Sequence, residues 1–216
     1  MSEPLVIVGA GGFGRETLDV VEAVNRAGVH PAFTILGVLD DAPALLALDR
    51  LASRGIAFLG DIDTWLGSGE TARYLIAIGN PRVRALVDER FRADGRDVAT
   101  VIHPTATVGS AGSIAPGAVV CAGAQISTNV VLGRHVHVNP NATIGHDAML
   151  ADFVSINPGA IISGEVSVGE QTLVGAGAVI LQGIAVGSRC TIGASACVTR
   201  DVGENTTVKG IPAREI

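Results

Sequence analysis

His146 and Asp147 are adjacent titratable residues in a stretch that otherwise holds small and aliphatic residues, ATIGHDAML at positions 142–150. Histidine is the side chain whose ordinary pKa lets it accept a proton near neutral pH. A carboxylate on its far ring nitrogen fixes the tautomer and favours the imidazolium that forms when the proton arrives. The pair is therefore a candidate general base with its orienting group, and the alternative is a histidine that simply faces solvent at a corner of the fold.

A second group of residues could bind phosphate. The segment PLVIVGAGGFG at positions 4–14 runs from an apolar strand into the spacing Gly9-x-Gly11-x-x-Gly14, and a helical pattern follows. Glycines allow a diphosphate to approach the backbone, and the start of a helix offers N–H groups and a positive dipole end. The motif is weak alone, and two alternatives remain open: an NAD site, with Asp40 near the position of a ribose-binding acid, and glycines used only for packing.

Two more apolar segments are predicted to form strands of the sheet that would position these glycines. FTILGVLDD reads as a second strand ending at Asp40 and Asp41, and ARYLIAIGNP as a third ending at Gly79 and Asn80. Alternation with helical stretches predicts a small parallel α/β sheet whose ligand crevice lies at the carboxyl ends of its strands. Because about 100 residues hold only half of a dinucleotide fold, one nucleotide diphosphate fits better than two linked nucleotides.

The second half of the chain contains an internal repeat that would position His146. An aliphatic residue recurs at every sixth position without a gap, and small or β-branched residues stand two places before most of these positions. A period of six predicts short strands joined by corners, with the aliphatic side chains pointing inward, and therefore a parallel β-helix. The series is Ile102, Val108, Ile114, Val120, Ile126, Leu132, Val138, Ile144, Leu150, Ile156, Ile162, Val168, Val174, Ile180, Val186, Ile192 and Val198.

The composition narrows the class of protein. The chain has 216 residues, a formal net charge of -6 and no stripe of Lys and Arg, which argues against nucleic acid as a partner. We also expect no membrane span, because no apolar run approaches the roughly 18 residues required. The three cysteines form no CxxC pair, which favours a reducing compartment and no structural zinc. We expect a cytoplasmic protein without a metal.

Together, VIVGAGGFGRE, VLDD, AIGNPRVR and the hexads resemble the sugar O-acyltransferase family, which includes sialic acid O-acetyltransferases and bacterial nucleotide-amino-sugar N-acetyltransferases. The resemblance covers essentially the whole chain. It implies a nucleotide-sugar-binding α/β domain at residues 1–100, and at residues 101–216 a left-handed β-helix with a C-terminal tail. The family's β-helix has a triangular section, with three hexads per coil, and its members are typically homotrimers.

The resemblance also assigns roles to residues. His146 and Asp147 match the family's catalytic His-Asp/Glu pair, and Gly164, one coil onward, matches the position whose N–H meets the thioester carbonyl of acetyl-CoA. Lys209 and Arg214, in the tail VKGIPAREI, would meet the phosphates of CoA. Binding of the nucleotide sugar is assigned to the glycine turn, to an acid near the base or ribose, and to residues that close the other side, namely Gly9, Gly11, Gly12, Phe13, Asp40, Gly79 and Asn80.

Two further positions bear on the sugar. Asn139 would hold the sugar or align the base, as would Asn141, although an asparagine also suits a coil corner. Ser155 stands where many amino-sugar enzymes carry a second histidine, in the segment DFVSINPGA. A serine cannot replace an imidazole charge, but it can hydrogen-bond a sugar hydroxyl. This departure puts the exact substrate in question more than the reaction.

The expected reaction is direct transfer of an acetyl group from acetyl-CoA to an amine, at C4, of a UDP- or GDP-linked amino sugar. The sequence leaves open whether the nucleotide is UDP or GDP, and whether His146 takes the proton or only positions the amine. Alternatives are O-acetylation of a sialic acid-like sugar and a non-catalytic trimeric scaffold that binds a nucleotide sugar. A less favoured hypothesis joins His135 and His137, which alternate like outward and inward strand positions, with His146 in a zinc site resembling that of β-helical carbonic anhydrases. His30 and His103 are expected at the surface.

Overall fold

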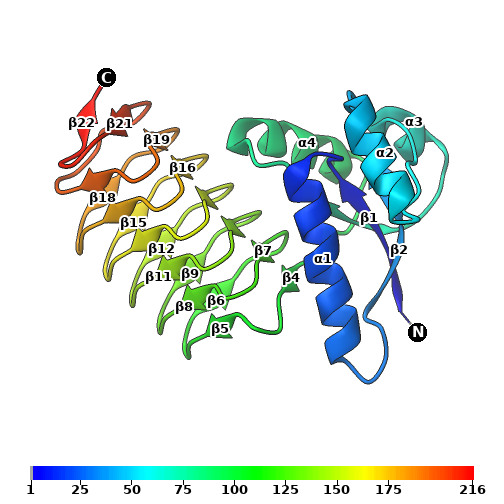
Figure 1. Cartoon of the computed structure of the whole chain (residues 1–216), viewed down its shortest axis with the longest axis horizontal. Coiled ribbons are helices and arrows are strands. Elements are labelled where there is room, and N and C mark those ends of the chain that lie inside the picture. Colours follow the sequence, from blue (N-terminus) through cyan, green and yellow to red (C-terminus); the bar gives the residue numbers. More distant parts are fainter. Residues whose placement is uncertain (1) are drawn as a thin grey trace. The chain divides into compact units, whose positions relative to one another are not determined.

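The structure, a computed structural model, describes residues 2–216. The chain divides into two compact units, the first ending at Gly79 and resuming at Val83–Val101, and the second made of Asn80–Arg82 and Ile102–Ile216. Figure 1 shows an α/β unit and a parallel β-helix. This architecture confirms the predicted fold class.

The first unit is built on a three-stranded parallel sheet of order β2-β1-β3. The central strand β1 is completely buried from Leu5 to Val8, as its unbroken apolar run predicts. The last residues of the three strands, Val8, Leu39 and Ile76, are neighbours in register. The segments that follow the strands therefore emerge at one edge of the sheet. In chain order the elements are β1 (Glu3–Val8), α1 (Gly12–Ala27), β2 (Phe33–Leu39), α2 (Leu45–Ser53), α3 (Ile62–Gly67), β3 (Arg73–Ile76) and α4 (Pro81–Ala93).

The second unit is a stack of coils, each with three two-residue strands. Each strand pairs in parallel with the strands of the preceding and following coils, as Ile144 does with Ile126 and Ile162. Three sheets result, which form the faces of the β-helix (Figure 1). The six-stranded face holds β5 (Thr107–Val108), β8 (Gln125–Ile126), β11 (Thr143–Ile144), β14 (Ile161–Ile162), β17 (Val179–Ile180) and β20 (Cys197–Val198).

The other two faces complete each coil. The five-stranded face holds β6 (Ser113–Ile114), β9 (Val131–Leu132), β12 (Met149–Leu150), β15 (Ser167–Val168) and β18 (Ala185–Val186). The eight-stranded face holds β4 (Val101–Ile102), β7 (Val119–Val120), β10 (His137–Val138), β13 (Ser155–Ile156), β16 (Leu173–Val174), β19 (Thr191–Ile192), β21 (Thr207–Lys209) and β22 (Arg214–Glu215).

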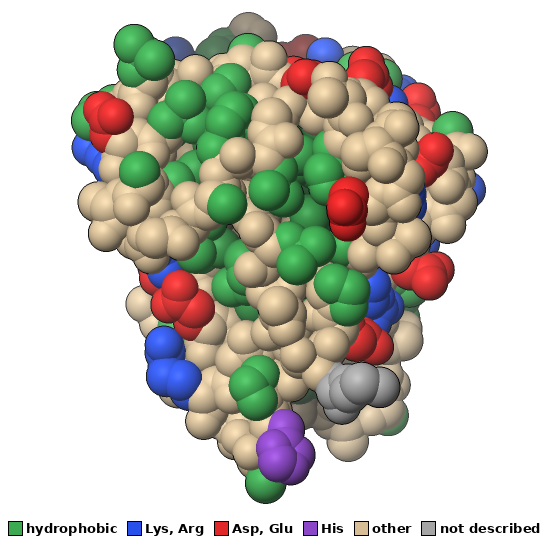
Figure 2. Space-filling view, turned by 90° about the vertical axis from the view of Figure 1, so that its right-hand side faces the viewer, with side chains coloured by type: hydrophobic (Ala, Val, Ile, Leu, Met, Phe, Trp, Pro, Cys, Tyr) green, Lys and Arg blue, Asp and Glu red, His purple; other side chains and the backbone are tan. Residues whose placement is uncertain are grey.

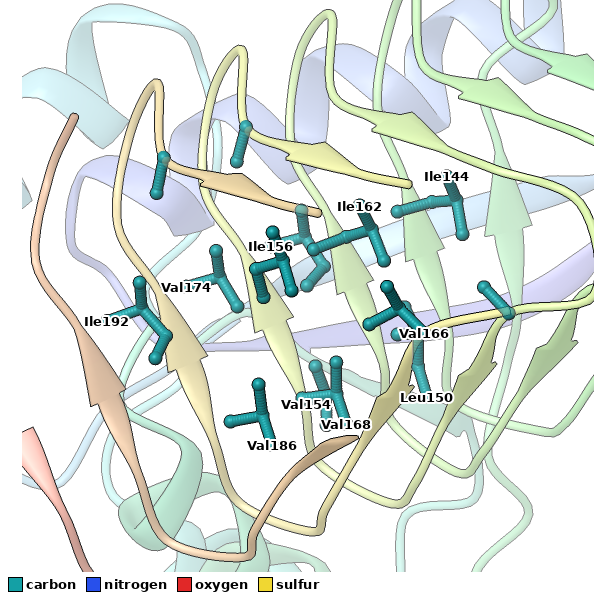
Figure 3. Close-up of a cluster of buried hydrophobic side chains, with 14 of the residues drawn as sticks. Ile144, Leu150, Val154, Ile156, Ile162, Val166, Val168, Val174, Val186 and Ile192 are labelled. Atoms are coloured by element: carbon teal, nitrogen blue, oxygen red, sulfur yellow. The ribbon is translucent and has the colours of Figure 1, made fainter. Parts of the chain in front are cut away.

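The interior of the β-helix is lined by the predicted aliphatic series. Each member is the second residue of a strand, and the side chains from the three faces meet in the middle of the coil (Figure 3). Val108 is an exception, with 44% of its surface exposed. It lies in β5, the terminal strand of its face, so no earlier strand on that face covers it.

The corners of the coils use a left-handed backbone conformation. Ala111, Asn129, Asp147 and Glu165, which occupy the same corner in successive coils, have φ between 58° and 60°. Such values are uncommon outside glycine, and asparagine and aspartate tolerate them best. Here alanine and glutamate adopt them as well, because the stacked backbone hydrogen bonds fix each corner. The backbone conformation alone therefore does not determine which residue type occupies a corner.

The repeat changes phase at its end. The series predicted from the sequence ends at Val198, but Val202 bridges to Val186, an interval two residues shorter than that of the earlier coils. Val208 then pairs with Ile192, and both Val202 and Val208 are buried. The last coil is thus shortened but continues the core. The chain then turns back as β22, antiparallel to β21.

The surface of the described residues carries charges of both signs. On the face shown in Figure 2, hydrophobic side chains gather near the middle, and acidic and basic side chains lie around them. None of the helices in residues 2–216 is long and apolar enough to cross a bilayer.

Candidate active site

His146 lies at the corner that follows β11, with about half of its side chain exposed. Its Nδ1 lies 2.7 Å from Oδ2 of Asp147. An ionised carboxylate can only accept hydrogen bonds, so a neutral imidazole in this contact donates from Nδ1 and leaves the lone pair on Nε2. The hydrogen bond from His146 is the largest cause that lowers the pKa of Asp147, followed by one from Asn129. The geometry suits a base whose tautomer is fixed by its neighbour.

The imidazole lies over Gly164 in the next coil. A Cβ at Gly164 would come within 2.5 Å of Nε2 of His146, so only a glycine leaves room for the ring in this position. The backbone itself does not require glycine, since Gln182 occupies the equivalent position one coil further on. The structure therefore brings together the two residues that the sequence placed one coil apart.

An open groove of about 490 Å³ runs along the six-stranded face and ends at His146. Its other polar side chains are uncharged, and they include the amide of Gln125 and the hydroxyls of Ser127, Thr128 and Thr143. Amides and hydroxyls can donate and accept hydrogen bonds with a neutral, hydroxyl-rich ligand. These residues were not singled out by sequence, although the hexad register places Gln125 and Thr143 at outward strand positions and Ser127 and Thr128 directly after β8.

Asn139 and Ser155 lie elsewhere in the coil. Asn139 follows β10 and Ser155 lies in β13, both on the eight-stranded face, whereas His146 follows a strand of the six-stranded face. Asn139 is buried and its Nδ2 donates to the carbonyl of Ile156 at 2.9 Å, which is the use of an asparagine at a coil corner. Ser155 is also buried. Within one chain the structure does not gather these two residues with His146.

Lys209 and Arg214 face each other as register partners in the terminal hairpin of β21 and β22. Both are exposed. Arg214 also lines a pocket of about 130 Å³, together with Arg200 and the acidic Asp201 and Glu215. The tail thus places the two cationic side chains Lys209 and Arg214 together at the last coil, with carboxylates next to Arg214.

The glycine turn follows β1 at the edge where all three strands of the α/β unit end. Gly9 has φ of 117°, which favours glycine, and a Cβ at Gly14 would lie 1.8 Å from the carbonyl oxygen of Gly9. Gly11 and Gly12 instead face open space, with no atom within 4 Å of a built Cβ. Helix α1 begins without a side-chain cap. Gly9 and Gly14 thus serve the fold, while Gly11 and Gly12 leave space beside the start of a helix.

Asp40, which was predicted to approach the base or ribose, instead contacts the backbone of the glycine turn. Asp40 accepts hydrogen bonds from the backbone N–H groups of Ala10 and Ala42, at 2.8 and 2.9 Å. Its carboxylate therefore holds the turn in place, a role that its position after a strand could not reveal.

The remaining residues predicted to bind the nucleotide lie at the starts of two helices. Gly79 is exposed, and Oδ1 of Asn80 accepts from the N–H of Arg82 at the start of α4. Phe13 lies in the first turn of α1 and is half-buried. Phe13 comes shortly after β1 in the chain, and Gly79 and Asn80 come shortly after β3.

The histidines considered for zinc are arranged differently from expectation. Val136 and Val138 point inward, whereas His135 occupies a corner with φ of 52° and His137 the outward position of β10. Both histidines are nevertheless buried, and His135 stacks on Phe153 with ring centroids 5.3 Å apart. Residues 2–216 contain no group of three or more His, Cys, Asp or Glu side chains placed to hold a metal ion.

Comparison with known proteins gives consistent results. Residues 4–91 match the PglD N-terminal domain family. The GDP-perosamine N-acetyltransferase of Escherichia coli O157:H7 is 31% identical over 147 residues, which are 68% of this chain and 63% of that protein. The match thus spans less than two thirds of that relative.

Two solved structures resemble the whole chain. The acetyltransferase domain of PglB from Neisseria gonorrhoeae, in complex with acetyl coenzyme A, is 32% identical, with a TM-score of 0.84 and full coverage of both chains. A histidine-to-asparagine mutant of perosamine N-acetyltransferase from Caulobacter crescentus, in complex with CoA and GDP-perosamine, is 27% identical. Its TM-score is 0.86, with 99% of this chain and 96% of that chain covered.

Proposed function

Because this chain belongs to the nucleotide-amino-sugar N-acetyltransferase family, we propose that it transfers the acetyl group of acetyl-CoA to the C4 amine of a nucleotide-linked amino sugar. The observation that carries the proposal is the position of His146. Its ring is oriented by Asp147, lies over Gly164 and borders the groove on the six-stranded face.

The proposed reaction is a direct transfer. The amine attacks the thioester carbonyl while Nε2 of His146 takes its proton, and Asp147 stabilises the imidazolium that forms. The N–H of Gly164 donates to the oxyanion of the tetrahedral intermediate. Collapse of the intermediate forms the amide and breaks the C–S bond, and the thiolate of CoA takes the proton from His146. The products are the N-acetylated sugar nucleotide and CoA.

The α/β unit would hold the nucleotide. The diphosphate is proposed at Gly11 and Gly12, where the uncapped start of α1 can donate backbone hydrogen bonds. Phe13, Gly79 and Asn80 would border the nucleotide. The carboxylate of Asp40 would act mainly by holding the glycine turn in place. The relatives solved with GDP-perosamine favour GDP as the first nucleotide to test.

CoA would extend from Gly164 toward the terminal hairpin, where Lys209 and Arg214 lie next to each other. The hairpin strand β21 pairs with β19, beyond the coil of Gly164. An extended cosubstrate with phosphates at one end and a thioester at the other suits such a layout.

We propose a homotrimer with acetyl-CoA between two subunits, in which Asn139 and Ser155 of one subunit would approach the site of another. Their place on a different face from His146 supports this arrangement. Light scattering coupled to size-exclusion chromatography measures the molar mass, and thus the number of subunits, directly. Acetyl-CoA as the cosubstrate favours a reaction in the cytoplasm.

Gly164→Ala is predicted to lower kcat on the order of 30-fold, because the new methyl group would displace the imidazole from its position. Stability should change little, since Gln182 carries a side chain at the equivalent corner position. Gln182→Ala is the matched control, because it places the same alanine one coil further on, away from His146. Steady-state kinetics with thermal unfolding of both variants make the comparison. Wild-type kcat in Gly164→Ala would show that the ring does not need this position.

The proposed function is tested with acetyl-CoA and a panel of UDP- and GDP-linked 4-amino sugars, by following release of the CoA thiol. We expect turnover with at least one of them and an N-acetylated product by mass spectrometry. Turnover only with the corresponding hydroxyl sugars would establish O-acetylation instead. Binding of nucleotide sugars without thiol release from any acceptor would identify a non-catalytic scaffold.

A further inference from the structure

Asn129 belongs to the coil before His146 and makes a side-chain contact that its position in the sequence did not suggest. Its Nδ2 lies 3.0 Å from Oδ1 of Asp147, whose other oxygen contacts His146. We infer that Asn129 is a positioning residue, which holds the Asp147 carboxylate so that this carboxylate in turn keeps His146 in the reactive tautomer. Its effect on rate rests on the proposed acetyl transfer, whereas its effect on the tautomer does not.

The direction of both hydrogen bonds follows from chemistry. A carboxylate offers only acceptors, so the amide of Asn129 must turn its NH₂ group toward Asp147, and His146 must present Nδ1–H. Each oxygen of the carboxylate then has its own donor. The two donors together lower the pKa of Asp147, which keeps the carboxylate ionised. With one oxygen held by Asn129, rotation of the carboxylate away from the ring costs a hydrogen bond.

The backbone does not explain why asparagine stands here. The equivalent corner residues one coil before and two coils after, Ala111 and Glu165, have φ of 59° and 60°, like Asn129 at 58°. The coils also stack without its side chain, since the N–H of Asn129 donates to the carbonyl of Ser110 and the N–H of Asp147 to that of Thr128. What the side chain of Asn129 adds is the contact with Asp147.

The kinetic test compares three substitutions at this position. Asn129→Ala removes the donor in a corner that already accepts alanine, and Asn129→Asp keeps the shape but places a second carboxylate against Asp147. We expect both to lower kcat about tenfold, with KM for both substrates within about twofold, because a charged hydrogen bond that orients the base is lost. Asn129→Gln retains an amide donor and should recover part of kcat.

The matched control is Asn205→Ala. Asn205 also has a left-handed backbone, with φ of 57°, and its Oδ1 accepts a hydrogen bond from Arg189 at 2.8 Å. The control thus loses a side-chain hydrogen bond to a charged partner at the same kind of corner. We expect its kcat to equal that of the wild type, and thermal unfolding of all variants to be similar.

The decisive measurement is independent of activity. NMR of protein with ¹⁵N-labelled histidine rings, with the His146 signals identified by their loss in His146→Asn, reports which ring nitrogen carries the proton. The wild type should show the Nδ1–H tautomer, and Asn129→Ala should show a mixture with Nε2–H. An unchanged tautomer in Asn129→Ala, or wild-type kcat in both Asn129→Ala and Asn129→Asp, would overturn the inference. A tautomer shift in a protein that acetylates no sugar would support it while refuting the proposed function.

Discussion

His146→Asn is expected to lower kcat for acetyl transfer by about 100-fold or more, with little change in KM for either substrate. The amide nitrogen of asparagine can replace Nδ1 as a donor to Asp147, so the substitution removes chiefly the proton acceptor at Nε2. Binding of the sugar nucleotide should persist, because the diphosphate is proposed at Gly11 and Gly12, which belong to the first unit, whereas His146 belongs to the second. Steady-state kinetics and calorimetric titration with the sugar nucleotide measure the two effects separately.

A loss of only a few fold would contradict an obligatory base. In that case His146 would position the amine, and water would carry the proton away. Asp147→Asn is the companion variant, since it keeps the shape of the carboxylate and removes its charge. If His146 is the base, this variant should also lose activity, because the imidazolium would lack its stabilising partner.

Gly14→Ala is expected to destabilise the α/β unit by about 3 kcal/mol or more, the usual scale of a severe steric substitution. The added Cβ would lie 1.8 Å from the carbonyl oxygen of Gly9, and a backbone oxygen cannot move aside as a flexible side chain does. For a unit of this size the melting temperature should fall by roughly 10–20 °C. The four helices in residues 2–216 all lie between Gly12 and Ala93, so helical circular dichroism follows this unit selectively.

Gly12→Ala is the matched control in the same turn. Its Cβ would meet no atom within 4 Å, and alanine is favoured over glycine in a helix, so stability should be kept or slightly raised. If the diphosphate binds here, KM for the sugar nucleotide should rise about tenfold, since the methyl group fills space beside the helix start. Equal melting temperatures for the two variants would refute the packing role of Gly14. An unchanged KM for the sugar nucleotide in Gly12→Ala would show that the diphosphate binds elsewhere.

The hexads predicted the β-helix because a period of six is incompatible with a helix or a simple strand, and burial of the aliphatic series follows directly from it. Gly164 could be placed next to His146 by counting one coil forward. Counting one coil backward from Asp147 gives Asn129 in the same way, but a polar residue at a corner is usually explained by the turn itself. Only the side-chain contact separates the two explanations.

Other residues were beyond sequence reasoning. Asp40 follows a strand, where an acidic residue either contacts a ligand or binds the backbone, and its two bonds to Ala10 and Ala42 favour the second use. The shortening of the last coil leaves Val202 and Val208 in the core, out of phase with the earlier series. In the sequence, a register shift of two residues looks like the end of the repeat. Only the pairing of Val202 and Val208 with the preceding coil shows that the stack continues.

The stacking of similar coils also fixes distances along the axis of the β-helix. Each coil adds one strand spacing of about 4.8 Å to the separation between Gly164 and the terminal hairpin, and leaves the corner geometry unchanged. Distances along the axis can therefore change only in whole steps, by duplication or loss of a complete coil. A protein of this design can be matched to a longer or shorter acyl carrier without any change to its reacting groups.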